Sequence, residues 1–275
     1  MNGASTPERE FVGSPEVIRA EHLDVGYRDT VVWKDATFDV RRGEFVAVIG
    51  PNGAGKTTLF RMLLGLQRPL GGTLTVFGAP PRRGNQRIGY VPQRHTIDHE
   101  THIEAATLVR LGVSGTKWGP GFSLSDEKEA AAEALEAVGA AELGRKSLGS
   151  MSGGELQRVF LAEALVGNPE MLLLDEPLSN LDLRRSRDLV EVVHGLVRSR
   201  EVTTLLVAHD INPLIQCLDK VIYIANGNVA TGPPETVLTS SSLTELYGVP
   251  VEVLHDSRNN IVIVGGEDPH GGENG

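Results

Sequence analysis

The sequence predicts an α/β fold in which helices cover a mostly parallel β-sheet. Residues 45–49 form an apolar run consistent with a strand buried on both faces, and a glycine-rich turn and a helical pattern over residues 56–66 follow it. Apolar runs at residues 171–174, 203–208 and 221–224 are further candidate strands, with a helical pattern between two of them. Strands that alternate with helices in this way favour parallel pairing.

The middle of the chain, from about residue 95 to 167, carries helical patterns and no convincing strand. Ser125 precedes two acidic residues, which is typical of a helix N-cap followed by acids in the first turn. A second helical pattern begins near Gly154 and stops before Pro169. We therefore expect a helical subdomain inserted into a single α/β domain of residues 15–240.

The two ends of the chain are polar. We expect a flexible arm over residues 1–14, a small C-terminal extension over residues 241–266 and a disordered tail over residues 267–275. The N-terminus is acidic and unlike a signal peptide, and no apolar run approaches the length of a membrane span. The sequence therefore predicts a soluble chain.

Composition narrows the functional classes. Hydrophobic residues make up 40% of the 275 residues, which is enough for a substantial core. The net charge is −10 and no Lys/Arg cluster is dense enough to indicate a nucleic-acid surface, so we expect no nucleic-acid partner. The single cysteine, Cys217, lies among apolar residues and predicts a buried side chain in a reducing cytosol.

A phosphate-binding loop is predicted at residues 50–57, Gly-Pro-Asn-Gly-Ala-Gly-Lys-Thr. Its glycines allow successive backbone N–H groups to turn toward the β- and γ-phosphates of a nucleotide, and the helix that follows adds its N-terminal dipole. Lys56 supplies positive charge to the same oxygens, and Thr57 can offer its hydroxyl to Mg²⁺. A glycine turn with a surface lysine is the alternative, and the strand before the loop and the helix after it argue against that alternative.

Two adjacent acids, Asp175 and Glu176, follow an apolar strand. Buried acids are costly unless they meet a cation or another partner. Because side chains alternate along a strand, the two acids have different roles: Asp175 is placed to hold Mg²⁺ through its coordination shell, and Glu176 to polarise a water for attack on the γ-phosphate. Alone, such a pair would often be the start of a loop; together with the phosphate-binding loop it predicts a catalytic site.

Ser152-Gly153-Gly154 opens a predicted helix and provides a second anion-binding helix N-terminus. One chain needs a single cradle for its nucleotide, so the second is expected to serve the ATP of a neighbouring chain. With this segment, the ordered set of motifs resembles that of the ATP-binding-cassette (ABC) ATPases, over about residues 17–240. The resemblance implies a P-loop NTPase fold with a RecA-like core, and two subunits that hold two ATP molecules between them. Both half-sites are intact in this chain, so a homodimer is the simpler expectation, and a heterodimer is the alternative.

The resemblance also implies roles for single residues. Tyr27 corresponds to an adenine-stacking aromatic, Gln93 to a glutamine that senses Mg²⁺ and the attacking water, and His209 to a switch histidine at the γ-phosphate; a core tyrosine and a structural histidine are the alternatives. Residues 179–182 resemble the segment that couples the two sites across the dimer. Glu155 departs from the family's usual glutamine, and we expect it to weaken nucleotide affinity slightly at most. The resemblance thus implies nucleotide contacts for Tyr27, Gly50, Pro51, Asn52, Gly53, Ala54, Gly55, Lys56, Thr57, Thr58, Ser152, Gly153 and Gly154, metal contacts for Thr57, Gln93 and Asp175, and catalytic roles for Glu176, His209 and Gln93.

Three flanking segments, residues 89–98, 232–238 and 246–253, resemble the ATPase subunits of divalent-metal importers for zinc, manganese or iron. This resemblance implies an integral-membrane permease as partner, an extracytoplasmic metal-binding protein that acts through the permease, and a cytoplasmic location on the inner face of the cell membrane. A permease-free ABC ATPase, for example one for iron–sulfur cluster assembly, and an exporter cassette are the alternatives. ABC ATPases of nucleic-acid repair or translation usually carry two cassettes in one chain or large insertions, and this acidic sequence shows neither. The Ser-Gly-Gly segment and the paired acids Asp175 and Glu176 exclude a small-molecule P-loop kinase.

Three histidines, His95, His99 and His102, lie among acids shortly after Gln93. His95 and His99 are four residues apart, so a helical start could bring all three to one side and bind a metal ion. An importer passes its cargo through the membrane chain, however, and a polar loop after Gln93 suits contact with the permease. We therefore favour a permease-facing loop over a metal site.

Overall fold

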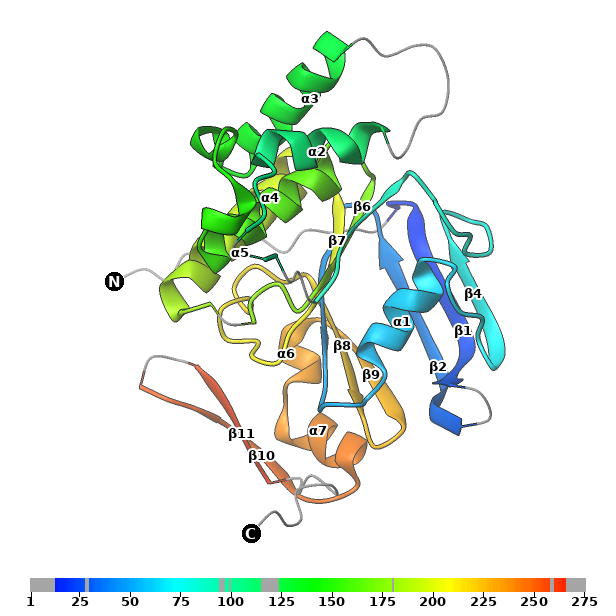
Figure 1. Ribbon diagram of the computed structural model, residues 1–275. Coiled ribbons are helices and arrows are strands. Elements are labelled where there is room, and N and C mark those ends of the chain that lie inside the picture. The colour runs from blue at the N-terminus through cyan, green and yellow to red at the C-terminus, as the bar shows by residue number, and fades with distance from the viewer. Residues whose placement is uncertain are drawn as a thin grey trace. The chain divides into compact units, whose positions relative to one another are not determined.

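Figure 1 shows a computed structural model of the chain, which describes residues 13–27, 30–93, 97–98, 100–114, 124–179, 181–257 and 260–265, without the side chains of residues 27, 113 and 114. The chain folds into two compact units. The first combines residues 1–81 with residues 209–275, and the second comprises residues 82–208.

The larger part of the first unit is built from two groups of strands and helix α1. Its elements are β1 (Glu16–Tyr27), β2 (Thr30–Arg41), β3 (Phe45–Ile49), α1 (Lys56–Leu63), β4 (Gly71–Val76), β8 (Lys220–Ala225) and β9 (Asn228–Gly232). Three strands form an antiparallel sheet in the order β2-β1-β4, and β3 pairs in parallel with β8, which pairs antiparallel with β9. All residues of β3 are buried, because the strand is apolar on both faces.

The C-terminal part of the first unit ends in two short helices and a β-hairpin. Its elements are α6 (Pro234–Val237), α7 (Ser240–Tyr247), β10 (Val251–His255) and β11 (Ile261–Gly265). The hydroxyl of Thr244 in α7 accepts a hydrogen bond from Val251 N at 3.0 Å. The side-chain amide of Asn212 donates to Ile261 O at 3.1 Å and accepts from Ile261 N at 2.6 Å. The side chain of Asn212 thus donates one hydrogen bond to the backbone of the hairpin and accepts another from it, as the backbone of a neighbouring strand would.

The second unit joins a parallel sheet to a group of helices. Its elements are β5 (Ile88–Val91), α2 (Ala105–Ser114), α3 (Leu124–Ala137), η1 (Ala141–Leu143), η2 (Leu148–Ser150), α4 (Gly153–Leu165), β6 (Met171–Asp175), α5 (Leu183–Arg200) and β7 (Thr203–Val207). The strands pair in parallel in the order β5-β6-β7, and β6 and β7 are buried throughout. Helices α2, α3 and α4 pack on one another and lie together at the top of Figure 1.

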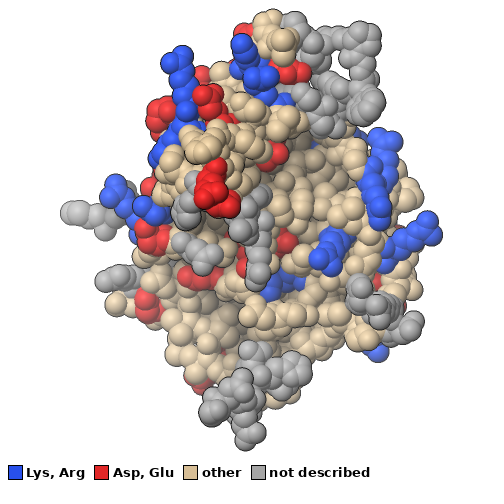
Figure 2. Space-filling model, viewed as in Figure 1, with Lys and Arg blue, Asp and Glu red and all other residues tan. Residues whose placement is uncertain are grey.

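Charged side chains of both signs cover the helical part of the second unit. Figure 2 shows Lys and Arg side by side with Asp and Glu at the top of the view, where α2 and α3 lie. One such pair joins these helices, with Arg110 Nε 4.0 Å from Glu127 Oε2. In the part of the chain that the structure describes, no helix is long and apolar enough to cross a membrane.

The predicted α/β class with parallel pairing is confirmed. The candidate strands at residues 45–49, 171–174, 203–208 and 221–224 correspond to β3, β6, β7 and β8. Three of these strands are buried along their whole length, which explains why their apolar runs could be recognised. The helical pattern between residues 171 and 208 is α5.

Three details differ from the sequence-based expectations. The helix predicted over residues 56–66 ends at Leu63, because the chain turns at Gly65 with a φ of 68°. Helix α3 begins one residue before Ser125, so the prediction of Ser125 as its N-cap is wrong. Cys217 is half-buried rather than buried, because it lies in a series of turns and not in a helix or strand.

The domain boundaries stay predictions. Residues 1–12 and 266–275, which hold most of the predicted arm and the whole predicted tail, lie outside the described residues. In the described part of residues 95–167, the regular elements are α2, α3, η1, η2 and α4.

Candidate functional site

The phosphate-binding loop connects β3 to α1 in the first unit. Gly50 begins the loop with a φ of 149°, and Gly55 precedes the helix with a φ of 92°. A Cβ atom on Gly50 would overlap the carbonyl oxygen of Ile224 in β8, so this position requires glycine. The two glycines let the backbone turn at both ends of the loop, directly before the N-terminus of α1, whose N–H groups point toward the loop.

Lys56, the first residue of α1, is only 5% exposed. Its Nζ donates to the carbonyl oxygens of Gly50 at 2.7 Å and Pro51 at 2.8 Å, so its charge lies inside the loop. A buried ammonium is favourable only beside polar or anionic groups. The residues therefore fit a nucleotide, because phosphate oxygens at this loop would meet the ammonium and the helix N–H groups. Thr57 and Thr58 are half-buried in the same turn.

The predicted catalytic acids lie at the end of β6 in the second unit. Asp175 is 1% exposed, and Tyr90 Oη donates to its Oδ2 at 3.5 Å. Glu176 has a φ of 53°, a strained conformation for a residue with a side chain, and such strain gathers at functional sites. The parallel pairing of β5 with β6 brings the residues after both strands together, and Gln93 Nε2 donates to Glu176 Oε2 at 2.6 Å. Gln93 thus orients the carboxylate that follows the buried acid.

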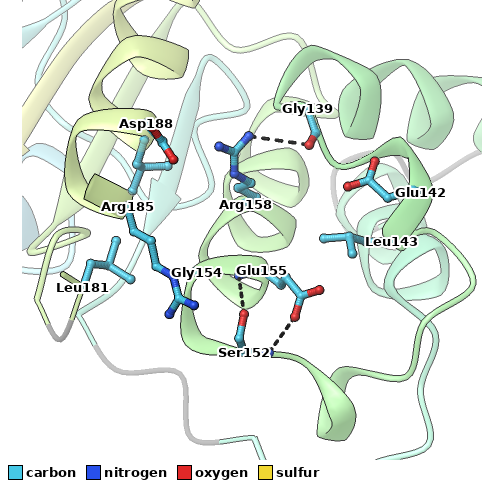
Figure 3. A pocket seen from close by; sticks show the side chains of 11 residues that line it. Gly139, Glu142, Leu143, Ser152, Gly154, Glu155, Arg158, Leu181, Arg185 and Asp188 are labelled. Carbon is cyan, nitrogen blue, oxygen red and sulfur yellow. Dashed lines mark hydrogen bonds between the residues drawn. The ribbon is translucent and has the colours of Figure 1, made fainter. Parts of the chain in front are cut away.

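The Ser-Gly-Gly segment (residues 152–154) begins α4 in the second unit. Ser152 is the N-cap: its Oγ accepts from Glu155 N at 3.4 Å, and its N–H donates to Glu155 Oε2 at 2.7 Å (Figure 3). This reciprocal arrangement is a capping box. A Cβ atom on Gly153 would meet no atom within 4 Å, so this side of the segment is open. The positive end of the α4 dipole makes it suited to an anion.

Glu155 is paired with a lysine. Lys146 Nζ lies 2.7 Å from Glu155 Oε1. This hydrogen bond, followed by the backbone N–H of Ser152, lowers the pKa of Glu155 to about 2. The negative charge that the sequence places next to the Ser-Gly-Gly segment is therefore compensated within the unit.

The sequence profile of the ABC transporter family matches residues 33–179, more than half of the chain. The match includes the phosphate-binding loop, the Ser-Gly-Gly segment and both acids. The chain belongs to the ABC transporter family. Cassettes of this family bind and hydrolyse ATP, and a pair of them works with a membrane permease; the motifs of this chain are those of such an ATPase.

Relatives with named cargo resemble nearly the whole of this ABC cassette. A zinc import ATP-binding protein of Pseudomonas syringae is 35% identical over 88% of this chain and 86% of the relative. A manganese transport ATP-binding protein of Bacillus subtilis is 31% identical over 87% and 95%. A phosphonates import ATP-binding protein of Haloquadratum walsbyi is 35% identical over 80% and 73%. Among solved structures, a chain of a transporter assigned to the metal-chelate type, in an inward-facing conformation, matches with a TM-score of 0.78 at 26% identity, over 91% of this chain and 98% of that chain.

The predicted site residues of the cassette are divided between its two units. The first unit carries the phosphate-binding loop, Thr58, Tyr27 and His209; Tyr27 ends β1 and its side chain lies outside the described residues, whereas His209 is exposed. The second unit carries the acids, the Ser-Gly-Gly segment and Gln93, and within it Gln93 and Glu176 are brought together. The roles of these residues stay predictions.

The predicted coupling segment, residues 179–182, lies between Glu176 and α5. The hydroxyl of Ser179 donates to Glu176 O at 2.8 Å. Asp182 is the N-cap of α5, where its Oδ1 accepts from Arg185 N at 2.9 Å. The segment is therefore anchored at one end to the predicted catalytic acid and at the other end to a helix.

The hypothesis of a histidine metal site stays untested. His95 and His99 lie outside the described residues, and His102 is exposed. Within the described ranges, no group of three or more His, Cys, Asp or Glu side chains is placed to hold a metal ion.

Sequence reasoning missed two residues that contact the site of the cassette. Tyr90 contacts Asp175, and Lys146 pairs with Glu155. Side chains alternate along β5, so Tyr90 lies on the face opposite to the buried Gly89. This alternation is the sequence signal that could have indicated that Tyr90 lies near the end of the neighbouring strand. Lys146 lies outside any helix, so no helical spacing links it to Glu155.

Proposed function

We propose that this cassette is the ATP-hydrolysing subunit of an importer for a divalent metal ion, zinc or manganese. On the inner face of the cell membrane, a homodimer of the chain drives a permease, to which an extracytoplasmic metal-binding protein delivers the ion. The observation that best supports ATP hydrolysis is the hydrogen bond of 2.6 Å from Gln93 Nε2 to Glu176 Oε2, next to the buried Asp175. Similarity to zinc and manganese cassettes over almost the whole chain supports the cargo.

In this proposal the first unit holds the nucleotide. The N–H groups of the phosphate-binding loop and the ammonium of Lys56 bind the β- and γ-phosphates, and the buried position of Lys56 keeps its charge directed at them. Tyr27 stacks on the adenine, and His209 contacts the γ-phosphate.

The carboxylate of Asp175, which is 1% exposed, fits a cation, because Mg²⁺ prefers carboxylate oxygens as ligands. Thr57 and Asp175 would hold Mg²⁺, and Gln93 would be a further contact of the ion. When bound, Mg²⁺ neutralises charge on the β- and γ-phosphate oxygens.

Glu176 accepts a proton from the attacking water as the water oxygen bonds to the γ-phosphorus. The bond between that phosphorus and the bridging oxygen of ADP breaks, so the products are ADP and inorganic phosphate. Gln93 holds the carboxylate in one orientation through its side-chain N–H. The contribution of this chain is therefore positioning and proton acceptance, as is general for phosphoryl transfer.

The Ser-Gly-Gly segment serves the ATP of the partner cassette. Its open helix N-terminus contacts the γ-phosphate across the dimer, so that loss of this phosphate removes the contact. Closure with ATP and reopening after hydrolysis form a two-state switch, which the permease converts into transport.

The hydrolytic role is tested with Glu176→Gln in the purified chain. The variant should still bind ATP, because the phosphate-binding loop is unchanged, and its turnover should fall by a factor on the order of 10²–10⁴. Near-normal hydrolysis would refute the assignment of Glu176 as the proton acceptor.

The cargo is tested in cells whose only copy of the gene carries Glu176→Gln, grown with scarce metals. Elemental analysis should show a selective fall in zinc or manganese, restored by the unchanged gene. Unchanged metal contents would overturn the metal proposal. The phosphonate relative makes phosphonate import the second candidate, and it predicts loss of growth on a phosphonate as the sole phosphorus source.

A further inference from the structure

Four asparagines in the chain are followed directly by glycine: Asn2, Asn52, Asn226 and Asn274. In such a pair the backbone nitrogen of the glycine can attack the amide carbon of the asparagine side chain, because glycine has no Cβ atom that hinders the approach. The first and the last pair lie outside the described residues, whereas Asn52 lies in the phosphate-binding loop and Asn226 in the turn between β8 and β9 (Figure 1). The two described pairs differ in how firmly their reacting groups are held.

Both residues of the Asn52-Gly53 pair are exposed. In the described part of the chain, neither the side-chain amide of Asn52 nor the N–H of Gly53 has a hydrogen-bond partner. The bonds of the loop lie to either side of the pair, where Ala54 N donates to Pro51 O at 3.3 Å and Lys56 Nζ donates to the same oxygen at 2.8 Å. A Cβ atom on Gly53 would meet no atom within 4 Å, so there is room for a ring to close at this position.

The charges around the loop favour attack by Gly53. The backbone nitrogen attacks after it has lost its proton, so positive charge nearby stabilises the reacting form. Lys56 is 5% exposed, donates to the carbonyl oxygen of Pro51 and is the first residue of α1. The ammonium and the positive end of the helix dipole therefore both lower the cost of an anionic nitrogen in the loop.

Asn226 provides the contrast within the same unit. Its side-chain amide donates to the carbonyl oxygen of Tyr247 at the end of α7, so this bond must break before the side chain can turn toward Gly227. The backbone of the turn is also held, because Asn228 Nδ2 donates to Asn226 O at 3.3 Å and Lys34 N donates to Gly227 O at 3.3 Å. The same dipeptide is thus fixed in the β8–β9 turn and free to react in the phosphate-binding loop.

We propose that Asn52 is a site of spontaneous deamidation, which inactivates the phosphate-binding loop unless a nucleotide is bound. The Gly53 nitrogen forms a bond to Asn52 Cγ, and the bond from Cγ to Nδ2 breaks. The departing amide nitrogen takes up the proton that the Gly53 nitrogen lost and leaves as ammonia. Water then opens the imide ring at one of its two carbonyl groups and leaves an aspartate or an isoaspartate. Either product places a carboxylate in the loop.

The consequence for ATP rests on the proposed function, in which the N–H groups of the loop bind the β- and γ-phosphates. A carboxylate at position 52 repels these phosphates. An isoaspartate also inserts its Cβ atom into the backbone, which displaces the N–H groups of the loop. A bound nucleotide acts in the opposite direction, because a Gly53 N–H that donates to phosphate keeps its proton and does not attack. The loop is therefore modified when empty and protected when occupied.

The test follows deamidation of the purified full-length chain at mildly alkaline pH, by mass spectrometry of its tryptic peptides. Asn52 should deamidate roughly fivefold to tenfold faster than Asn226, because Asn226 must first break a hydrogen bond. Saturating ATP, in the chain carrying Glu176→Gln so that the nucleotide is not consumed, should slow the reaction at Asn52 by on the order of tenfold. The rate at Asn226 should not change with ATP.

The effect on binding is measured on the same incubated samples. The fraction of the chain that binds ATP should fall in step with the fraction modified at Asn52. The variant Asn52→Asp, which has the sequence of one product, should bind ATP about tenfold or more weakly than the parent. Asn226→Ser is the matched control, because it removes the Asn-Gly pair outside the loop, and it should lose ATP binding as fast as the parent.

Equal rates at Asn52 and Asn226 would overturn the assignment of the site. An unchanged rate at Asn52 while ATP is bound would overturn the protection, and a loss of ATP binding that follows Asn226 instead of Asn52 would overturn the consequence. If the fresh chain does not bind ATP, the proposed function fails. The comparison of the two pairs without ATP then still decides whether Asn52 is the modified residue.

Discussion

Replacing Lys146 by methionine is expected to weaken the fold, because it leaves the carboxylate of Glu155 without its cation. In the native structure Lys146 Nζ lies 2.7 Å from one oxygen of Glu155, and the other oxygen accepts the N–H of Ser152. Methionine keeps an unbranched apolar stem at this position, so the substitution removes mainly the charge.

The lowered pKa of Glu155 sets an upper limit on the stability that Lys146→Met can remove. A fall from 4.5 to about 2 corresponds to at most about 3 kcal/mol of stabilisation of the ionised form in the folded chain. The side chains of Lys146 and Glu155 are 36% and 31% exposed, so solvent screens the pair, and Lys146 causes only part of the shift. We therefore expect Lys146→Met to lower the free energy of unfolding by about 1 kcal/mol at neutral pH.

The effect depends on pH with a defined sign. Because the pKa of Glu155 is lowered in the folded state, its stabilisation is fully present above the unfolded value of about 4.5 and is lost as the pH falls toward about 2. Denaturant unfolding of the parent and of Lys146→Met, at several pH values from 7 down to 3, measures the difference. It should shrink below about pH 4.5. A difference that stays constant over this range, or that is absent at pH 7, would refute the reasoning.

A double variant provides the control. Glu155→Gln keeps an acceptor for the N–H of Ser152 but removes the carboxylate, so adding it to Lys146→Met should recover most of the lost stability. Lys146→Met should also weaken ATP-dependent dimerisation, measured in the Glu176→Gln background, because it leaves an unpaired negative charge beside the Ser-Gly-Gly segment. Adding Glu155→Gln removes this charge and should restore dimerisation. Lack of recovery would show that Lys146 acts through packing and not through its charge.

Three further substitutions test other parts of the cassette. Lys56→Ala should weaken ATP binding by on the order of tenfold or more, measured by equilibrium dialysis; unchanged affinity would reject its phosphate role. Gln93→Ala should lower the ATPase turnover number by about tenfold with little change in ATP affinity, because it frees the carboxylate of Glu176 to reorient. Gly89→Ala should lower the free energy of unfolding by about 1–3 kcal/mol in denaturant, because its methyl group would overlap the carbonyl oxygen of Ala164.

Predictability differed sharply between parts of the fold. The strands β3, β6, β7 and β8 could be predicted because their apolar residues are consecutive, and a strand covered on both faces has this composition. Strands β1 and β2 are not predicted from the sequence. Their polar and apolar residues alternate irregularly, since the pairing shifts between Ala20 and Leu23 and again between Leu23 and Val25.

The features of the site also differ in how well the sequence predicts them. Loop chemistry is local, so the phosphate-binding loop and the Ser-Gly-Gly segment can be recognised from residues that are adjacent in sequence. The contact between Gln93 and Glu176 depends on the pairing of β5 with β6 across 83 residues, which no local pattern encodes. The pairing of Lys146 with Glu155 likewise depends on how the loop before α4 folds back over the helix start.

The two hydrogen bonds between Asn212 and Ile261 in the C-terminal hairpin have a consequence for truncation of this chain. Asn212 lies three residues after His209, and Asp210 also accepts hydrogen bonds from its backbone and side-chain N–H groups. A truncation before β10 would leave the amide that Ile261 now satisfies without its partner, next to the predicted switch histidine. The C-terminal hairpin thus stabilises the segment that follows β7. Deletion of the hairpin would disturb the residues around Asn212, which are far from the hairpin in sequence.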